Sequence, residues 1–390
     1  MQLVAYGAQD IYLTGNPQIT FFKVVYRRHT NFSMEAIAQT FSGAGKIASG
    51  DGKNTATATI SRNGDLIHKM YINCEAPVGT QATTGSKIVK EAELEIGGQK
   101  IDKHWSSWNN IWNELSTPES KAVGLKSMQG DLGIAGTSGS GASTIQVPLN
   151  FWFCRNPGLA LPLIALQYHE VKVQFVFGGE NETRLTVNNP LILMVDYIYL
   201  DTDERRRFAQ ISHEYLIEQL QYSGAVEAKG SASGTNNKII LSHNHPVKEL
   251  IWVNRDNSGS VLGWNSWSSV KNCNLELNGH DRMAARDGSY FSLVQPYQHH
   301  TNIPAPGINV YSFALDPEEH QPSGSCNFAN LRGINLEIEL TKTTTDSYLP
   351  QIPGETTTKA NTDSYEMNLY AVCYNVFRIM SGIGALAYSS

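Results

Sequence analysis

The sequence predicts an all-β protein made of two similar domains. Its composition is that of a globular chain with many turns, because 33 of 390 residues are glycine and only 17% are charged. A ten-residue stretch at 93–102 returns in similar form at 274–283, an offset of 275 − 94 = 181 residues. A second pair of similar segments, 195–200 and 369–374, follows in the same order with an offset of 369 − 195 = 174. Two ordered matches at nearly the same offset indicate a duplicated β domain.

The repeated stretch is typical of a strand that enters a tight hairpin turn. Leu94-Glu-Ile-Gly-Gly98 and Leu275-Glu-Leu-Asn-Gly279 alternate apolar and polar residues and then reach Gly-Gly or Asn-Gly. These pairs accept the positive φ that such turns require. Since all-β chains contain many similar strands, chance similarity is the alternative explanation.

The N-terminal residues predict an extended arm, followed by a series of strands. Residues 1–22 hold glycines and Asn16-Pro17 among apolar residues, a pattern that disfavours a packed helix. Ile19 to Arg28 is the first segment that reads as a strand. Further strands of the first half are predicted at 55–61, 66–75, 91–96, 151–153 and 171–177.

Two short helices are expected between these strands. Trp105, Trp108 and Trp112 recur at helical spacing, so this aromatic face should pack against a core, with a sugar-stacking platform as the alternative. Residues 201–208 begin with an N-cap and acids and continue with bases, as a short helix does.

This order predicts four segments. They are an N-terminal arm at 1–22, a first β domain at 23–201, a connector at 202–213 and a second β domain at 214–390. In the second domain, strands from Tyr215 onward are interrupted by long polar loops, which suit a surface function. These loops are expected at 224–237, 254–269, 299–307 and 341–364.

Charge and cysteine content exclude several classes of protein. The net charge of −6 and the pI near 6.0 argue against direct coating of nucleic acid, which needs excess Lys and Arg. No charged leader with an apolar stretch and no membrane-length apolar run is apparent. The cysteines are odd in number and lack a C-x-x-C pair, so buried free thiols in a reducing compartment are expected. They are Cys74, Cys154, Cys273, Cys326 and Cys373.

The sharpest candidate for enzymatic chemistry is the sequence His243-x-His245-x-x-x-Glu249. Two histidines and a glutamate at this spacing can bind a divalent metal on a hairpin of a cupin sandwich. The flanking glycines of that motif are replaced by Asn237 and Asp256, however, and Pro246 removes a strand hydrogen bond. Because signature loops of hydrolases and nucleotide-binding enzymes are also missing, we predict no catalytic, cofactor or metal site.

Motifs spread over the whole chain carry a family resemblance. They include Gln2 to Asp10, Asn16 to Lys23, Tyr26 to Phe32, Ile60 to Asp65, Leu94 to His104, Pro157 to Val171, Phe208 to Gln210, His213 to Gln219, Leu277 to Gly279, Gly288 to Phe291, Gln295 to Tyr297, Tyr311 to Leu315, Gln321 to Gly324, Cys326 to Phe328 and Arg378 to Gly382. Together they resemble the major capsid proteins of nucleocytoplasmic large DNA viruses, and the algal-virus branch is nearest.

The resemblance implies a structural, non-catalytic function in the virion. Members of that family build each subunit from two tandem eight-stranded jelly rolls with short helices in the loops. Three subunits form a pseudo-hexagonal capsomer of a large icosahedral shell, assembled in the host cytoplasm. The implied partners are further copies of the chain, neighbouring capsomers and minor capsid proteins, with an internal viral membrane near the N-terminal arm. Direct contact with the genome is not implied.

The resemblance also implies covalent glycans on asparagine. Ala360-Asn361-Thr362-Asp363-Ser364 is similar to the glycosylated contexts of the family, which makes Asn361 the candidate site. Ordinary sequons at Asn31 and Asn181 would not meet the secretory enzyme in a cytoplasmic protein.

The sequence is also compatible with two other functions. One is a tandem jelly-roll lectin or host-attachment protein that stacks sugars on Trp264 and Trp267. The other is the metal-dependent cupin enzyme described above.

Overall fold

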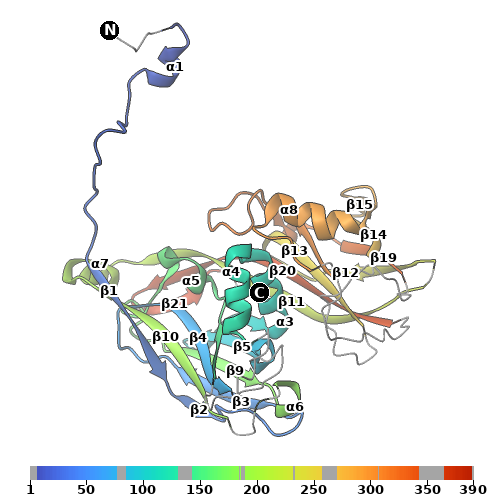
Figure 1. Cartoon of the computed structure of the whole chain (residues 1–390), viewed down its shortest axis with the longest axis horizontal. Coiled ribbons are helices and arrows are strands. Elements are labelled where there is room, and N and C mark those ends of the chain that lie inside the picture. The colour runs from blue at the N-terminus through green and yellow to red at the C-terminus, as the bar shows by residue number, and fades with distance from the viewer. Residues whose placement is uncertain are drawn as a thin grey trace.

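The strands form two β-sandwiches that lie side by side, and an N-terminal arm stands off the first (Figure 1). A computed structural model of the chain describes residues 7–76, 85–130, 143–183, 185, 189–231, 233–256, 270–305, 307–341 and 364–388. The predicted all-β class is confirmed.

The first domain consists of two antiparallel sheets on either side of one apolar core. One sheet has the order β1-β10-β4-β7, with bounds Phe32–Gln39, Leu191–Leu200, Leu66–Ala76 and Ser143–Pro148; β8 (Leu161–Pro162) pairs with β4. The other has the order β2-β3-β9-β5-β6, with bounds Phe41–Gly43, Asn54–Thr59, Val171–Phe177, Val89–Ile96 and Gln99–Trp105.

The second domain repeats this arrangement around a core of its own. One sheet has the order β11-β20-β13-β17, with bounds His213–Lys229, Ser364–Met380, Pro246–Asp256 and Ile308–Ser312; β18 (Cys326–Asn327) and β21 (Ile383–Leu386) pair with β13 and β20. The other has the order β12-β19-β14-β15, with bounds Thr235–Ile240, Ile334–Leu340, Val270–Leu277 and His280–Asp281; β16 (Arg286–Asp287) pairs with β14.

Four strands in each sheet of the first domain correspond in order to four in the second, which gives two tandem jelly rolls; β2 has no counterpart in the second domain, and β16 and β21 have none in the first. The repeated sequence occupies the same hairpin in both, between β5 and β6 and between β14 and β15. Gly97 and Gly98 have φ of 59° and 83°, and Asn278 and Gly279 have φ of 54° and 76°. The glycine and asparagine pairs therefore supply the left-handed conformations that the sequence predicted.

Helices occupy the connections. They are α1 (Asp10–Thr14), α2 (Gly85–Ile88), α3 (Ser106–Ser116), α4 (Glu119–Met128), α5 (Trp152–Arg155), η1 (Pro157–Leu159), α6 (Glu180–Thr183), α7 (Thr202–Gln210), η2 (Tyr290–Val294), α8 (Gln295–His299) and η3 (Phe328–Asn330). Both predicted helices are present as α3 and α7, and the Asp201 carboxylate caps α7 by accepting from the Thr202 amide. Within the described ranges, no helix has the length and apolar character needed to cross a membrane.

The strand predicted at Ile19 to Arg28 is wrong. Residues 21–23 of this segment form a turn and a bend, and within the described ranges it pairs with no strand; the first strand begins only at Phe32, which pairs with Leu200 at the end of β10. A β-prone sequence needs a neighbouring strand to satisfy its backbone groups, and β10 ends before it could serve the arm.

Two further expectations need correction. The run 151–153 forms the start of the one-turn helix α5 rather than a strand, and this turn buries Phe151, Trp152 and Phe153 together in the first core. The long loop expected at 224–237 is mostly strand, because β11 continues to Lys229 and β12 begins at Thr235.

The strands β11 and β20 join the two domains. Each has 17 residues, and the two are paired along their length. One end of this pair leaves the second domain and places Ile217, Phe377 and Ile379 in the core of the first. The Phe377 ring lies 6.3 Å from that of Trp152.

The five cysteines are free, as predicted. Cys74, Cys154, Cys273 and Cys373 are buried, and Cys326 is partly exposed. Burial raises the pKa of the Cys74 and Cys154 thiols to about 12. These side chains therefore behave as apolar core residues.

Candidate functional site: the interdomain seam and the arm

Helix α3 of the first domain covers the outer face of the β11-β20-β13-β17 sheet of the second (Figure 1). Side chains alternate along β13, so Ile251 and Val253 face the helix while Leu250 and Trp252 face the second core. The helix contributes four side chains that are at most 4% exposed: Trp108, Ile111, Trp112 and Leu115. The aromatic face predicted from the sequence thus packs against the neighbouring domain.

Polar contacts fix the position of α3 on this sheet. The hydroxyls of Ser107 and Tyr370 are 2.5 Å apart. The Ala305 amide donates to the Glu114 carboxylate at 3.0 Å, and the Asn302 side chain donates to the Glu114 carbonyl at 3.2 Å. Burial raises the pKa of Glu114. These polar contacts therefore fix the position of α3, in addition to its apolar packing against the sheet.

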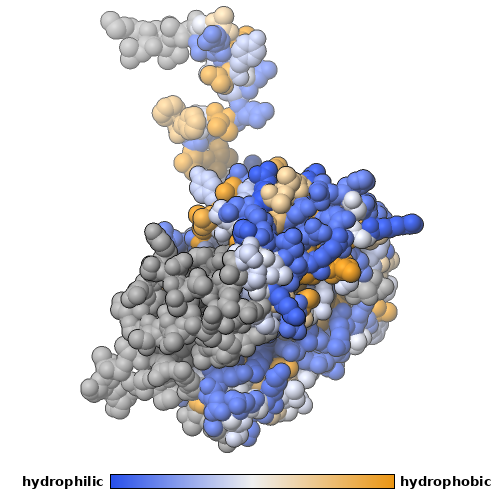
Figure 2. Space-filling view, turned by 90° about the vertical axis from the view of Figure 1, so that its right-hand side faces the viewer, coloured by the Kyte–Doolittle hydropathy of each residue, from blue (hydrophilic) through white to orange (hydrophobic). Residues whose placement is uncertain are grey.

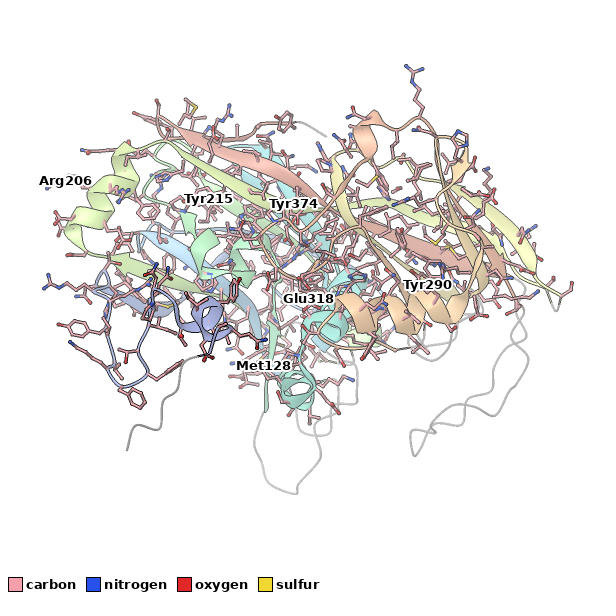
Figure 3. All side chains as sticks on the ribbon, turned by 90° about the horizontal axis from the view of Figure 1, so that it is seen from above. Met128, Arg206, Tyr215, Tyr290, Glu318 and Tyr374 are labelled. Atoms are coloured by element: carbon pink, nitrogen blue, oxygen red, sulfur yellow. The ribbon has the colours of Figure 1, made fainter. Side chains whose placement is uncertain are left out.

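A buried charge cluster lies beside α3 at the seam. Lys248 of β13, whose side chain is fully buried, donates to Glu218 of β11 at 2.6 Å. Arg155 of α5 donates to the other Glu218 oxygen at 2.7 Å and lies over the Trp112 ring at 4.3 Å. The Lys248 ammonium also lies 5.6 Å from the Tyr374 ring centre. Figure 3 places Tyr374 between the two sandwiches. Glu218 thus links both domains through one carboxylate.

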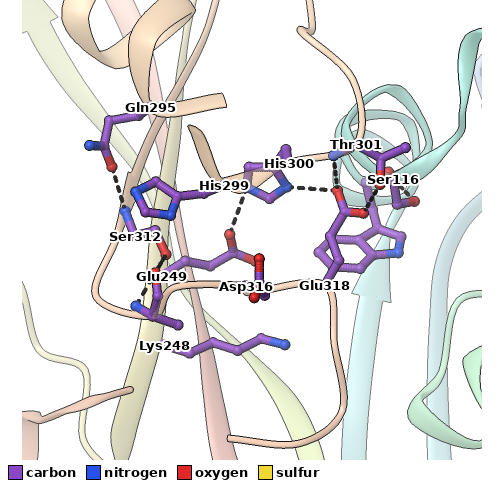
Figure 4. Close-up of polar contacts among 12 residues, drawn as sticks. Ser116, Lys248, Glu249, Gln295, His299, His300, Thr301, Ser312, Asp316 and Glu318 are labelled. Atoms are coloured by element: carbon purple, nitrogen blue, oxygen red, sulfur yellow. Dashed lines mark hydrogen bonds and ion pairs between the residues drawn. The ribbon is translucent and has the colours of Figure 1, made fainter. Parts of the chain in front are cut away.

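His300 forms a second buried charge cluster, with one carboxylate on each side of its ring (Figure 4). Its Nε2 lies 3.0 Å from Glu249, and its Nδ1 lies 2.9 Å from Glu318. Thr301 donates to Glu318 through its amide at 3.0 Å and through its hydroxyl. Burial opposes a charge on the ring, but the two carboxylates outweigh burial and raise the pKa of His300 to about 9. The imidazolium is therefore present at neutral pH and compensates Glu249, whose side chain is fully buried.

The residues of the suggested cupin motif do not assemble as a metal site would. His243 and His245 lie in the loop before β13, where burial lowers the pKa of both rings, that of His243 to about 4. Glu249 pairs instead with His300, a partner that sequence spacing did not suggest. Across the described ranges, no group of three His, Cys, Asp or Glu side chains is arranged so that it could hold a metal ion.

The N-terminal arm, which in the structure extends beyond the predicted 1–22 to the start of β1 at Phe32, carries large apolar side chains that lie in solvent. Figure 2 shows orange side chains along the part of the arm that stands off the body. Between residues 19 and 26, six of them are at least 74% exposed: Ile19, Phe21, Phe22, Val24, Val25 and Tyr26. Contiguous exposed apolar surface of this kind marks an interaction site.

Comparisons with known proteins match the whole chain to one family. Residues 20–209 match the family model for the N-terminus of major capsid proteins, and residues 204–385 match the model for the large eukaryotic DNA virus major capsid protein. The chain is 48% identical over 426 residues to the major capsid protein of Pyramimonas orientalis virus, covering 100% of this chain and 99% of that protein. The chain belongs to the major capsid protein family of large eukaryotic DNA viruses.

Other capsid proteins agree in sequence and in fold. The major capsid protein of Paramecium bursaria Chlorella virus 1 is 40% identical, with 100% of this chain and 99% of that protein covered. A chain from the PBCV-1 virus capsid superposes with a TM-score of 0.80 at 36% identity, covering 95% of this chain and all of that one. The Faustovirus major capsid protein shares the fold, with a TM-score of 0.66 at 13% identity and coverage of 96% and 94%.

Membership of the capsid protein family confirms the predicted structural, non-enzymatic role in the virion. Several residues singled out in the sequence fall outside the described ranges: Trp264, Trp267 and the glycosylation candidate Asn361. The sequons do not, and both Asn31 and Asn181 are exposed. Sequence reasoning missed the His300 and Glu218 clusters, since nothing in the local pattern marks those residues.

Proposed function

We propose that the chain forms homotrimeric, pseudo-hexagonal capsomers of the icosahedral shell of a large double-stranded DNA virus. The observation that supports this most directly is the pair of jelly rolls with matching strand order, fixed to each other by α3, β11 and β20. Three such chains present six similar domains around one axis, and contacts with neighbouring capsomers then repeat over the shell.

We propose that the arm binds components on the inner side of the shell, namely minor capsid proteins and the internal viral membrane. Its exposed apolar side chains lie next to Lys23, Arg27 and Arg28, a combination that suits an anionic lipid surface or an acidic protein. The net charge of −6 for the whole chain fits a shell that does not bind the genome directly.

Light scattering on a size-exclusion column tests the capsomer. We expect the full chain to elute with three times its mass of 43.0 kDa. A variant lacking residues 1–27 should keep this mass, because the arm side chains lie away from the body, but should lose flotation with anionic vesicles. A full chain that stays monomeric across concentration and salt contradicts the capsomer, and unchanged flotation of the shortened chain contradicts the role of the arm.

We also propose Asn361 as the site of a covalent glycan. Peptide mass mapping of protein from infected cells should find the added mass on the peptide that contains Asn361. The Asn361→Gln variant should lack that mass, while Asn31 and Asn181 stay unmodified in both proteins. Unmodified Asn361 in virion protein contradicts this assignment.

A further inference from the structure

Two of the sheets differ in the polarity of their outer faces. In β12-β19-β14-β15 the outer face is charged, for example at Lys238, Glu276 and Glu337, which are joined by ion pairs. In β1-β10-β4-β7 the side chains that alternate with the core residues are instead mainly apolar along β1 and β10, where Met34, Ala36, Ala38, Ile192 and Met194 lie near Tyr71 of β4. The polar members of this face are Asp196 on β10, Asn73 and Glu75 on β4, and Thr144 and Gln146 on β7. Met34 is 49% exposed and Ile192 is 42% exposed. An exposed antiparallel sheet is normally polar on its solvent side, so this face is suited to a partner.

The equivalent outer face in the second domain has a partner of this kind within the chain. It belongs to β11-β20-β13-β17, and α3 covers it. This helix lies in the connection between β6 and β7 of the first domain. Its apolar stripe includes Ile111, Trp112 and Leu115.

The second domain has a helical segment in the corresponding connection, between β15 and β17. This segment is η2 followed by α8, residues 290–299. One side packs on its own domain, where the Phe291 ring lies 5.3 Å from that of Trp252. The other side exposes Leu293 by 48%, Val294 by 40% and Tyr297 by 76%.

The exposed stripe occupies the same positions as the buried stripe of α3. Leu293, Val294 and Tyr297 follow Ile111, Trp112 and Leu115 at one offset, 297 − 115 = 182 residues. The shared hairpin turn has almost the same offset, 279 − 98 = 181. The duplication has therefore kept the apolar stripe in both copies, but only one copy is covered within the chain.

We propose that Leu293, Val294 and Tyr297 pack on the outer face of β1-β10-β4-β7 of a second copy of this chain. The contact repeats between chains what α3 does within one chain. It joins two different surfaces, so each chain offers one of each, and three chains related by a threefold rotation close into a ring. With three chains, six domains alternate around the ring. This inference rests on the capsomer proposed above and assigns the residues that hold it together.

Single charges placed on the two surfaces test the contact. Tyr297→Glu and Ile192→Glu should each reduce the solution mass threefold, from three times 43.0 kDa to one, because a carboxylate would be buried without a partner. Both positions are exposed in the single chain, so far-UV circular dichroism should show an unchanged fold. The matched control is Ile240→Glu, an apolar residue 76% exposed on β12, which should leave the trimer intact.

The outcomes separate this inference from the capsomer itself. If the wild type is a trimer and either Tyr297→Glu or Ile192→Glu remains one, the assigned contact is wrong and the capsomer stands. If the wild type is a monomer, both proposals fail.

Discussion

Replacing His300 with glutamine is expected to lower the free energy of unfolding by about 3–5 kcal/mol, measured by urea denaturation at pH 7. The change removes the cation that lies 3.0 Å from the fully buried Glu249 and 2.9 Å from Glu318. A buried carboxylate that loses its partner retains the cost of leaving water. The double variant His300→Gln, Glu249→Gln should recover much of the loss, because it removes the stranded charge as well.

The pH dependence of this effect has a definite sign. The pKa of His300 is about 9 in the folded protein and 6.5 without the fold, so the folded state holds the extra proton between these values. The contribution of His300 is complete below pH 6.5 and is lost as the pH rises through 9; it amounts to about 3 kcal/mol. The free energies of unfolding of the wild type and of His300→Gln should therefore converge as the pH rises from 7 to 10.

His299 provides the matched control for His300. It is the neighbouring residue, and its ring bonds the Leu315 carbonyl at 2.8 Å on the exposed side. His299→Gln should unfold within about 1 kcal/mol of the wild type. Equal stability of His300→Gln and wild type at pH 7, or parallel pH curves, would show that the ion pairs do not stabilise the fold.

Trp108→Ala is expected to destabilise the protein by about 3–5 kcal/mol. The indole is fully buried at the seam, with ring centres 5.6 Å from both Trp112 and Tyr370. Its removal leaves a cavity between α3 and the second domain. The measurement is the urea midpoint, followed by limited proteolysis to detect separation of the two domains.

Val123→Ala on α4 and Ser107→Ala serve as references for Trp108. Val123 is 68% exposed, so its truncation should have almost no effect. Ser107→Ala removes only the contact with the Tyr370 hydroxyl and should cost about 1 kcal/mol. A midpoint for Trp108→Ala equal to that of Val123→Ala would mean that the seam adds little to stability.

Local pattern predicted much of the fold correctly. Alternation placed β3, β5 and β9, and Gly-Gly with Asn-Gly placed the two equivalent hairpin turns. Prediction from the local pattern failed where the structure depends on a neighbouring strand or domain. Ile19 to Arg28 is as β-prone as a strand, but no strand of the described part of the chain pairs with it. Spacing also predicted that the tryptophans of α3 are buried, without indicating that the second domain buries them.

The buried charge clusters could not be predicted from the sequence for a different reason. His300 is 51 residues from Glu249 and 18 from Glu318, and only the sandwich brings the three side chains together. Conversely, the spacing of His243, His245 and Glu249 suggested a metal site, but the fold does not assemble these three side chains into one. Buried ion pairs depend on distances across strands, which a one-dimensional pattern does not contain.

The position of β20 in the sequence determines when the first domain can complete its core during synthesis. Phe377 and Ile379, which follow most strands of the second domain in the sequence, complete the core of the first domain. A ribosome that has made all of the first domain has therefore not yet supplied its closing side chains. The first domain therefore keeps apolar surface unfilled until β20 of the second domain has emerged, and contacts so distant in sequence form slowly. Each subunit thus matures as one piece, and the unit offered for assembly is the finished chain rather than either half.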